Sequence, residues 1–436
     1  MNCGTKIQDG ASFCSKCGTR VGVMPSPAPV GQPVGSGVSS SAKDVGNVVS
    51  GAFHSMGEKL NELAGGSGEV NLKFSDFFAD IFKPHTREEM DDMFICGTSK
   101  TTPDIREVST SWPRPWLWSR VMVLLLVVFV GFCLMFEWFG NALAIPGIIF
   151  FGAILVPFSL LVFFFETNAT RNISIAEMMK MFLIGGIASM LFTLIIGTVF
   201  PYTGVSEVVP SLLTGLVEEA AKIAIIMFFM MRTKGRNYIL SGLLIGAAVG
   251  AGFGAFETAG YAFQSMLSFG YQYGMVTIIV RAVLAIGMHT AWAAVEGAAL
   301  ALCESDHGFD IAQLGNPKFL IFAIMMMVLH GLWDMEIPFL DEPIFFGLFG
   351  IKYILLIIVV WVIIAVMLNR GLAQINQLAN AQPISPRAFA GSAPYSAAPA
   401  AQPQPRPQPV THSSQYQPDW LERSRQNQAG RHSRSE

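Results

Sequence analysis

The sequence predicts an all-α protein that crosses a membrane about eight times. Hydrophobic residues make up 52% of the 436 residues and charged residues only 14%, whereas a soluble domain carries about 25% charged residues. The apolar residues gather between Val121 and Asn369 in several runs of roughly 20, the length that crosses a bilayer core of about 30 Å. This composition excludes an ordinary soluble protein. The net charge of −3 gives no basic excess that would point to nucleic acid as a partner.

Composition divides the chain into five segments. They differ in their content of cysteine, of Pro, Gly and Ser, and of long apolar runs. We expect a small cytoplasmic zinc ribbon at 1–23, a flexible linker at 24–69, a cytoplasmic juxtamembrane segment at 70–115, a membrane-embedded domain at 116–370 and a disordered cytoplasmic tail at 371–436.

The first segment carries the cysteines of the predicted ribbon. Cys14 and Cys17 form a C-x-x-C-G knuckle, which is typical of structural zinc sites. Cys3 is also followed by Gly, as in a second knuckle whose other cysteine would stand just before Met1. We expect these three cysteines to hold a structural zinc ion. Its fourth ligand is either lost to a start codon placed too late or supplied from elsewhere, for example by Cys96, and a degenerate ribbon without metal is the alternative.

The juxtamembrane segment contains an apolar stripe between Leu72 and Phe82. Its spacing predicts a short amphipathic helix. That helix can lie on the membrane or on the core domain, and packing within a small cytoplasmic subdomain is equally compatible with the sequence.

Eight spans follow from the long apolar runs, and their loops predict the orientation of the protein. Nine Lys and Arg residues lie before the first span, in every second loop and after the last span, whereas the alternate loops contain none. The positive-inside rule therefore predicts a multi-pass protein of the cytoplasmic membrane with both termini in the cytoplasm. The expected spans are 117–137, 143–165, 179–200, 211–231, 238–261, 277–302, 317–337 and 345–369.

Ionisable side chains gather inside four of these spans. Each costs about 2.5–3.5 kcal/mol at the centre of a bilayer. Such residues normally face the interior of a helix bundle or a water-filled cavity, and they mark a functional site. They are Glu218, Glu219 and Lys222 in the fourth span, Glu257 in the fifth, Arg281, His289 and Glu296 in the sixth, and His330 and Asp334 in the seventh.

Helical spacing places several of these groups on shared faces. Lys222 follows Glu218 by four residues and Glu219 by three, so its ammonium can reach either carboxylate and leave the other as a general base. In the seventh span, the carboxylate four residues after His330 can fix the tautomer of its imidazole. Glu296 shares a face with the histidine of the sixth span but lies nearer the cytoplasm, and we expect it to have a polar packing role.

Two further features concern helix packing. Gly242, Gly246, Gly250 and Gly254 recur every four residues in the fifth span. Small residues at this spacing let two helix backbones approach closely in lipid. Lys352, near the start of the eighth span, is expected to extend outward to the interface.

With these motifs the chain resembles the PrsW family of bacterial intramembrane proteases, which is related to the CAAX-processing enzymes. The resemblance covers about Met181 to Met367, with one motif in each of spans four to seven and in family order. Two positions depart from the family pattern, since Thr258 and Asp334 each stand where Asn is expected. The matching motifs are EExxK from Glu218 to Lys222, FxxxE from Phe253 to Glu257, Arg281 with the HTAW that begins at His289, and the HGLWD from His330 to Asp334.

The resemblance implies an intramembrane endopeptidase that hydrolyses peptide bonds of membrane-anchored, often regulatory, proteins. Glu218 or Glu219 would then activate the attacking water, and Lys222 would hold this pair. Arg281 and Asp334 would have supporting roles. A glutamic and a metal-dependent mechanism both stay open at this point. Water positioning, polarisation of the scissile carbonyl or binding of a catalytic metal would fall to Glu257, His289 and His330.

Two other classes of protein use similar residues. Buried Glu, His and Lys side chains also form the relays of ion- or proton-coupled transporters. The first three spans lack charged motifs and the chain shows no internal repeat, which argues against a transporter. A catalytically inactive receptor is the third possibility. The partners we expect are a membrane-anchored protein substrate, the lipid bilayer, and cytoplasmic proteins that bind the ribbon or the tail.

Overall fold

A computed structural model describes the chain at residues 41–66, 74–98, 100–200, 208–233, 237–304, 310–344, 347 and 349–381. Within these ranges the chain forms helices and loops and no β-strand. The predicted all-α class is therefore confirmed. The ribbon cysteines Cys3, Cys14 and Cys17 and the tail beyond Ala381 lie outside the described residues.

The described helices differ in length from one turn to more than 30 residues. Labels with η mark short 3-10 turns, except that η3 is a π-helical turn. The elements are α1 (Ser41–Leu63), η1 (Phe74–Phe78), α2 (Arg87–Phe94), α3 (Leu117–Phe139), η2 (Ala142–Ala144), α4 (Ile145–Thr167), α5 (Ile175–Lys180), η3 (Met181–Gly185), α6 (Gly186–Val199), α7 (Val208–Met230), α8 (Ile239–Phe269), α9 (Tyr271–Leu284), η4 (Ala285–Gly287), α10 (His289–Leu302), η5 (Ile311–Gly315), α11 (Pro317–Asp334), α12 (Pro338–Asp341) and α13 (Ile351–Ala381).

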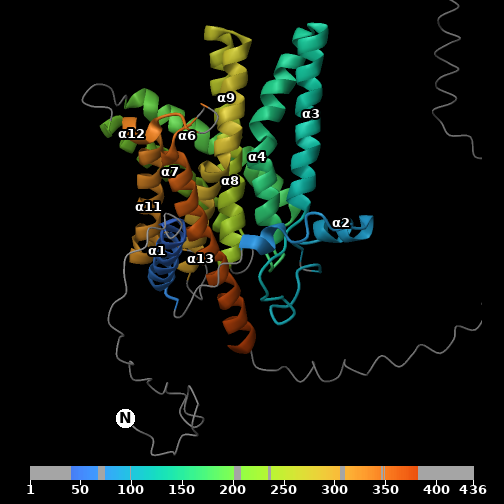
Figure 1. Cartoon of the computed structure of the whole chain (residues 1–436). Helices are drawn as coiled ribbons and strands as arrows, with labels where there is room; N and C mark the ends of the chain where they lie inside the picture. The colour runs from blue at the N-terminus through green and yellow to red at the C-terminus, as the bar shows by residue number, and fades with distance from the viewer. Residues whose placement is uncertain are drawn as a thin grey trace, which may run out of the picture. The chain divides into compact units, whose positions relative to one another are not determined.

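Seven helical stretches within the described ranges are long and apolar enough to cross a membrane, and each coincides with one of the eight predicted spans. The remaining predicted span is α7, a helix of 23 residues whose Glu218, Glu219 and Lys222 are buried. These charges lower its apolarity, and they are buried where α7 packs against α6, α8, α10 and α11. Figure 1 shows α7 within the bundle beside α11, while α3 and α4 run side by side.

Among the described helices, α8 and α10 share the most extensive contact, and the glycine ridge of α8 lies within it. A Cβ atom on Gly246 would lie 1.9 Å from the carbonyl oxygen of Ala293, and one on Gly250 would lie 2.2 Å from that of His289. Because no side chain fits there, the backbones touch. The ridge therefore fixes α10, and with it His289, against α8.

The sixth span is interrupted, whereas the sequence predicts one continuous helix over 277–302. Between α9 and α10, the turn η4 ends at Met288, whose φ of −101° and ψ of −145° are not helical. The indole nitrogen of Trp361 on α13 donates a hydrogen bond of 3.0 Å to the carbonyl of Ile286 in this turn. The interruption places His289 in the first turn of α10.

Both segments that flank the membrane domain are more ordered than composition predicts. The expected linker at 24–69 contains α1, whose end buries Leu60 and Ala64 against the core and which packs on α13 (Figure 1). The expected tail at 371–436 begins inside α13, which continues to Ala381 and buries Ile375. The high content of Gly and Ser led to the prediction of a linker, although α1 has an apolar face. The polar residues late in α13 led to the prediction of a tail, although the helix continues through them.

The juxtamembrane segment packs on the core and not as one amphipathic helix. It folds into η1 and the separate helix α2. Phe77 in η1 is buried, with its ring 5.0 Å from that of Phe163 and stacked on Trp112 at 5.6 Å. Of the predicted placements, packing on the core domain agrees with these contacts.

The outward extension expected for Lys352 is wrong. Its side chain is buried, and its ammonium lies 2.8 Å from Asp341 and donates to the carbonyl of Met335 at 2.6 Å. Lys352 therefore stabilises the end of α11 and the α11–α13 connection. The carbonyls that follow the last turn of a helix have no helical partner, and a cation satisfies one of them here.

Candidate active site

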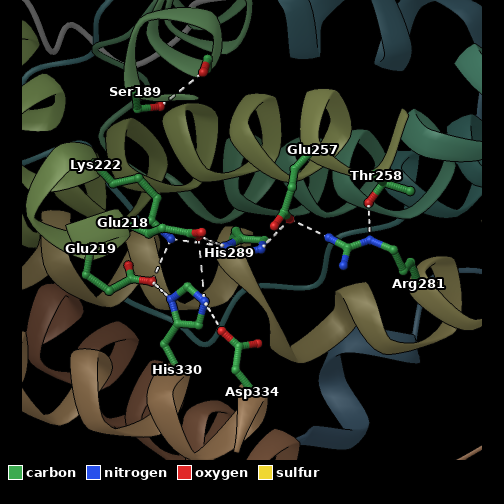
Figure 2. A network of polar contacts seen from close by, with 11 residues as sticks. Ser189, Glu218, Glu219, Lys222, Glu257, Thr258, Arg281, His289, His330 and Asp334 are labelled. Atoms are coloured by element: carbon green, nitrogen blue, oxygen red, sulfur yellow. Dashed lines mark hydrogen bonds and ion pairs between the residues drawn. The ribbon is translucent and has the colours of Figure 1, made fainter. Parts of the chain in front are cut away.

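Side chains from four helices meet in one buried cluster (Figure 2). Counted over the whole residue, backbone included, each of them has a relative exposure of 8% or less. All six candidate catalytic residues belong to it, with Glu218, Glu219 and Lys222 from α7, Glu257 from α8, His289 from α10 and His330 from α11.

Close backbone contacts bring these helices together. A Cβ atom on Gly215 of α7 would lie 2.8 Å from the backbone nitrogen of Gly331 on α11. Gly331 in turn faces Leu212. The short side chains let α7 and α11 approach at the level where His330 meets the two glutamates of α7. The glycine ridge of α8 does the same for His289.

Glu219 is the central acceptor of the cluster. The ammonium of Lys222 donates to its Oε1 at 2.6 Å, and Nδ1 of His330 lies 2.5 Å from the same oxygen. Glu219 and Lys222 are fully buried. The spacing in sequence allows Lys222 to reach either glutamate, and in the folded chain it pairs with Glu219. Lys222 also lies 3.0 Å from Nδ1 of His289.

Glu257 holds the second imidazole. Its Oε2 lies 2.8 Å from Nε2 of His289, and the guanidinium of Arg281 donates to the same oxygen. Arg281 also donates from Nε to the hydroxyl of Thr258 at 2.9 Å. Thr258, which departs from the family pattern, therefore supplies an acceptor for Arg281. Both hydrogen-bonded partners of Arg281 lie on α8, so these bonds hold its side chain beside the cluster.

Glu218 faces both imidazoles without a hydrogen bond. Its Oε2 is buried and has no hydrogen-bond partner among the residues that the structure describes. That oxygen lies 4.0 Å from Nδ1 of His289 and 3.6 Å from Nε2 of His330. Asp334, whose role the sequence assigned to the imidazole tautomer, lies 3.4 Å from the same Nε2. One carboxylate oxygen and two ring nitrogens thus point at one place.

This donor set fits a metal ion. Glu218, His289 and His330 offer ligand atoms that all lie within 4.8 Å of one another. Zinc ligands at about 2.0–2.2 Å from the ion are about 3.5 Å apart in a tetrahedral site. The other ring nitrogen of each histidine faces a carboxylate, as metal-binding histidines commonly do. The orphaned oxygen of Glu218 is the atom that such an ion would satisfy.

Exposure is not even across the cluster. The side chains of Glu219 and Lys222 are 0% exposed, whereas those of Glu218 and Glu257 are 11% and 10% exposed. Arg281 is 20% exposed and Asp334 36%. The cluster is therefore least covered by protein on the side of these four residues.

Two aromatic side chains that line the cluster were not among the residues predicted from the sequence. The ring of Trp292 stacks on that of His330 at 4.5 Å and lies 5.2 Å from that of His289. The ring of Phe253 lies 4.9 Å from that of His289 and 4.9 Å from the ammonium of Lys222. Both belong to the motifs quoted above, and their position beside the histidine and glutamate is the signal that could have identified them.

Comparisons with known proteins agree with this geometry. Residues 174–367 match the model of the PrsW family intramembrane metalloprotease, and residues 1–21 match a zinc-ribbon domain. Protease PrsW of Clostridioides difficile (strain 630) is 25% identical over 199 residues, which cover 44% of this chain and 76% of that protein. No solved structure matches the chain. Residues 174–367, which contain the whole buried cluster, are thus similar to the PrsW family of intramembrane proteases.

Proposed function

We propose that this protein is an intramembrane endopeptidase that cleaves membrane-anchored proteins at the cluster of Glu218, His289 and His330. One observation supports this most strongly, namely the convergence of an unpartnered carboxylate oxygen and two imidazole nitrogens from three helices. A membrane interior otherwise disfavours such groups, so their gathering indicates a function. The similarity to PrsW proteases supports proteolysis over transport or a purely receptor function.

Glu218, His289 and His330 would hold the catalytic metal of this metalloprotease family. The chemistry that zinc supplies with three protein ligands and an open position is polarisation of a carbonyl and activation of a bound water. The ammonium of Lys222 lies 3.0 Å from Nδ1 of His289, the nitrogen that would bind the metal. When that nitrogen is a ligand, the ammonium would donate to Glu219 alone.

The surrounding carboxylates position the two imidazoles. A proton on Nε2 of His289 is donated to Glu257, which leaves Nδ1 unprotonated toward the centre. A proton on Nδ1 of His330 is donated to Glu219, which leaves Nε2 unprotonated toward the same place. Each carboxylate therefore selects a tautomer by accepting from the far side of the ring.

Glu218 also has the features of a general base. It is the glutamate that Lys222 does not neutralise, and it lies at the more exposed side of the cluster. In a glutamic mechanism, in which Glu218 binds no metal, its carboxylate would accept a proton from the attacking water and return it to the amide nitrogen that leaves. The two imidazoles would then stabilise the oxyanion.

The placement of the protein in its membrane rests on the loop charges. We propose a multi-pass protein of the cytoplasmic membrane with both termini in the cytoplasm, because nine Lys and Arg residues lie on one side and none in the alternate loops. The ribbon would bind a structural zinc ion through Cys3, Cys14 and Cys17, and the ribbon or the tail would contact cytoplasmic partners. A fluorescent protein fused to the C-terminus should fluoresce, and alkaline phosphatase at the same place should be inactive.

Cleavage of a co-expressed single-span reporter tests the function. Glu218→Gln, His289→Ala and His330→Ala should each abolish cleavage while the protein still accumulates in the membrane. Glu336→Gln, an exposed glutamate just after α11, is the matched control and should leave cleavage unchanged. Cleavage that persists in all three site variants would contradict the protease assignment of this cluster. Proton flux without proteolysis would favour a transporter.

Metal content separates the two mechanisms. In a Cys14→Ala/Cys17→Ala variant the ribbon can no longer retain its ion, so the remaining zinc reports the membrane cluster. We expect zinc to remain in that variant and to be lost when His289→Ala is added, as measured by elemental analysis of the purified full chain. A metal-free variant with full activity would instead assign the glutamic mechanism.

A further inference from the structure

Glu296 is a buried acid that the mechanism above does not use. It lies on α10 two turns after His289 and has a relative exposure of 0%. Neither oxygen of its carboxyl group has a hydrogen-bond donor among the residues that the structure describes. An ionised carboxylate in such surroundings is strongly unfavourable, because it has lost its hydration and gained no partner.

Its neighbours are Glu219, which lies within hydrogen-bonding reach, and Lys222. Oε1 of Glu219 already accepts from Lys222 and faces Nδ1 of His330. The other oxygen, Oε2, is buried and has no donor in the described part of the chain. Two acidic side chains therefore face each other, and each has oxygen atoms that need a donor.

A single proton satisfies both groups. Lys222 balances one negative charge of the pair, and a proton on Glu296 removes the other. We infer that Glu296 is protonated and donates a hydrogen bond from its carboxyl group to Oε2 of Glu219, and that it is a positioning residue of the active site. This inference rests on the proposed function of the cluster, since it assigns Glu296 to the same site.

The consequence concerns the orientation of Glu219. With Lys222 and His330 at one oxygen and Glu296 at the other, the carboxylate cannot rotate. The ring of His330 takes its direction from that carboxylate, so Glu296 acts on the centre through two intervening side chains. The loss of such an outer partner typically costs 10–100-fold in activity of a metal site, about the same range as we expect here.

Two variants of nearly equal volume test the role of the donated proton. Gln at position 296 is neutral and can donate from its amide, whereas Leu is neutral and cannot. For the purified full chain acting on the reporter, Glu296→Gln should retain kcat within about threefold of the unmodified chain, and Glu296→Leu should lose about tenfold or more in kcat with little change in KM. Equal loss in both variants would overturn the inference, because it would mean that the charge of Glu296 is required.

Infrared spectroscopy reads the proton without any substrate. The full chain at neutral pH should show the carbonyl band of a protonated carboxylic acid that disappears in Glu296→Gln and persists in Glu336→Gln. A spectrum without that difference would overturn the inference, even where Glu296→Leu fails to fold. The two proposals fail separately, since absence of reporter cleavage by the unmodified chain contradicts the proposed function and leaves the infrared result to decide on Glu296.

Discussion

At the scale of single residues, one carboxylate oxygen of Glu257 contacts two side chains, His289 and Arg281. That oxygen lies 2.8 Å from Nε2 of His289 and accepts from Arg281. The amide oxygen of a glutamine can accept from the same two neighbours, but it carries no negative charge and is a weaker acceptor. The tautomer of His289 that leaves an acceptor toward the centre is then less strongly favoured.

We therefore expect Glu257→Gln to lower cleavage of the reporter by about 10–100-fold, the range for partners of metal-binding histidines. Rates of the purified variant measure the effect, and Glu336→Gln is the exposed control. A rate equal to that of the unmodified chain would show that Glu257 does not orient His289.

Cys96 is a second residue whose surroundings decide its chemistry. Its thiol is buried and donates to the carbonyl of Ile173 at 3.4 Å. Burial raises the pKa of the Cys96 thiol above its ordinary value. The thiolate, which binds zinc and reacts with alkylating agents, is thus disfavoured. The structure gives Cys96 a place in the core, which speaks against the expectation that it completes the zinc ribbon.

Alkylation measures this directly. Because only the thiolate reacts, iodoacetamide should modify Cys96 slowly at pH 7, and the rate should rise as the pH approaches and exceeds the raised pKa. Mass spectrometry of the Cys96 peptide follows the reaction. Rapid modification at neutral pH would contradict the burial of this thiol. Loss of the ribbon zinc in Cys96→Ala would show that Cys96 is a zinc ligand.

At the scale of elements, the contact between α8 and α10 sets the position of the site. A Cβ atom on Gly246 would lie 1.9 Å from a backbone oxygen of α10, whereas one on Gly260 of the same helix would meet nothing within 4 Å. Alanine raises the helix propensity equally at both positions. The difference between the two variants therefore isolates the helix contact.

Gly246→Ala should destabilise the protein by about 1–3 kcal/mol, the usual cost of overpacking, and Gly260→Ala should not. Thermal unfolding in detergent compares the two variants with the unmodified chain. If both variants unfold at the same temperature, the backbones of α8 and α10 do not touch at Gly246.

Contacts within one helix could be predicted from the sequence, and contacts between helices could not. Spacing alone places Lys222 beside a glutamate and Asp334 beside His330. Lys222 pairs with Glu219, the glutamate that also contacts His330, a residue of another helix. The approach of Glu257 to His289 likewise depends on how α8 packs on α10. The members of the cluster could therefore be predicted from their residue types, whereas the pairing of their side chains depends on how the helices pack.

The fold was predictable where apolar length decides it. Seven spans follow from composition, and α7 follows from the pattern around its charges. The interruption at η4 could not be predicted, because nothing in the local sequence requires it. The turn contacts a distant helix, α13, whose Trp361 donates to Ile286 and whose Ile357 faces Gly287. The burial of Lys352 is of the same kind, since its partners come from the preceding connection.

At the scale of the whole molecule, the end of α13 is part of the membrane domain. Gln374 accepts from the backbone nitrogen of Ile239 at 3.0 Å, and Leu372 and Ile375 are buried. The first turn of α8 thus receives a cap from a residue 135 positions later in the chain. This contact joins the last helix to the one that carries the glycine ridge.

Truncation should show where the domain ends. A chain that ends after Ala381 should be as stable as the full chain, whereas one that ends after Arg370 should lose about 2 kcal/mol or more, since burial of one large aliphatic side chain contributes about 1.5–3 kcal/mol. Thermal unfolding of both chains gives the comparison. Equal stability of the two truncated chains would place the end of the domain before Leu372.

The charges of α7 also bear on how the protein is made. A translocon admits a segment into lipid according to its apolarity, and each charged residue near the centre opposes this by about 2.5–3.5 kcal/mol. His330, which faces Glu219, follows it by 111 residues. Until α11 has left the ribosome, Glu219 lacks its partner His330. We therefore expect α7 to be inserted in the bilayer only weakly during that time. Biogenesis of the catalytic cluster would thus wait for the C-terminal half of the membrane domain.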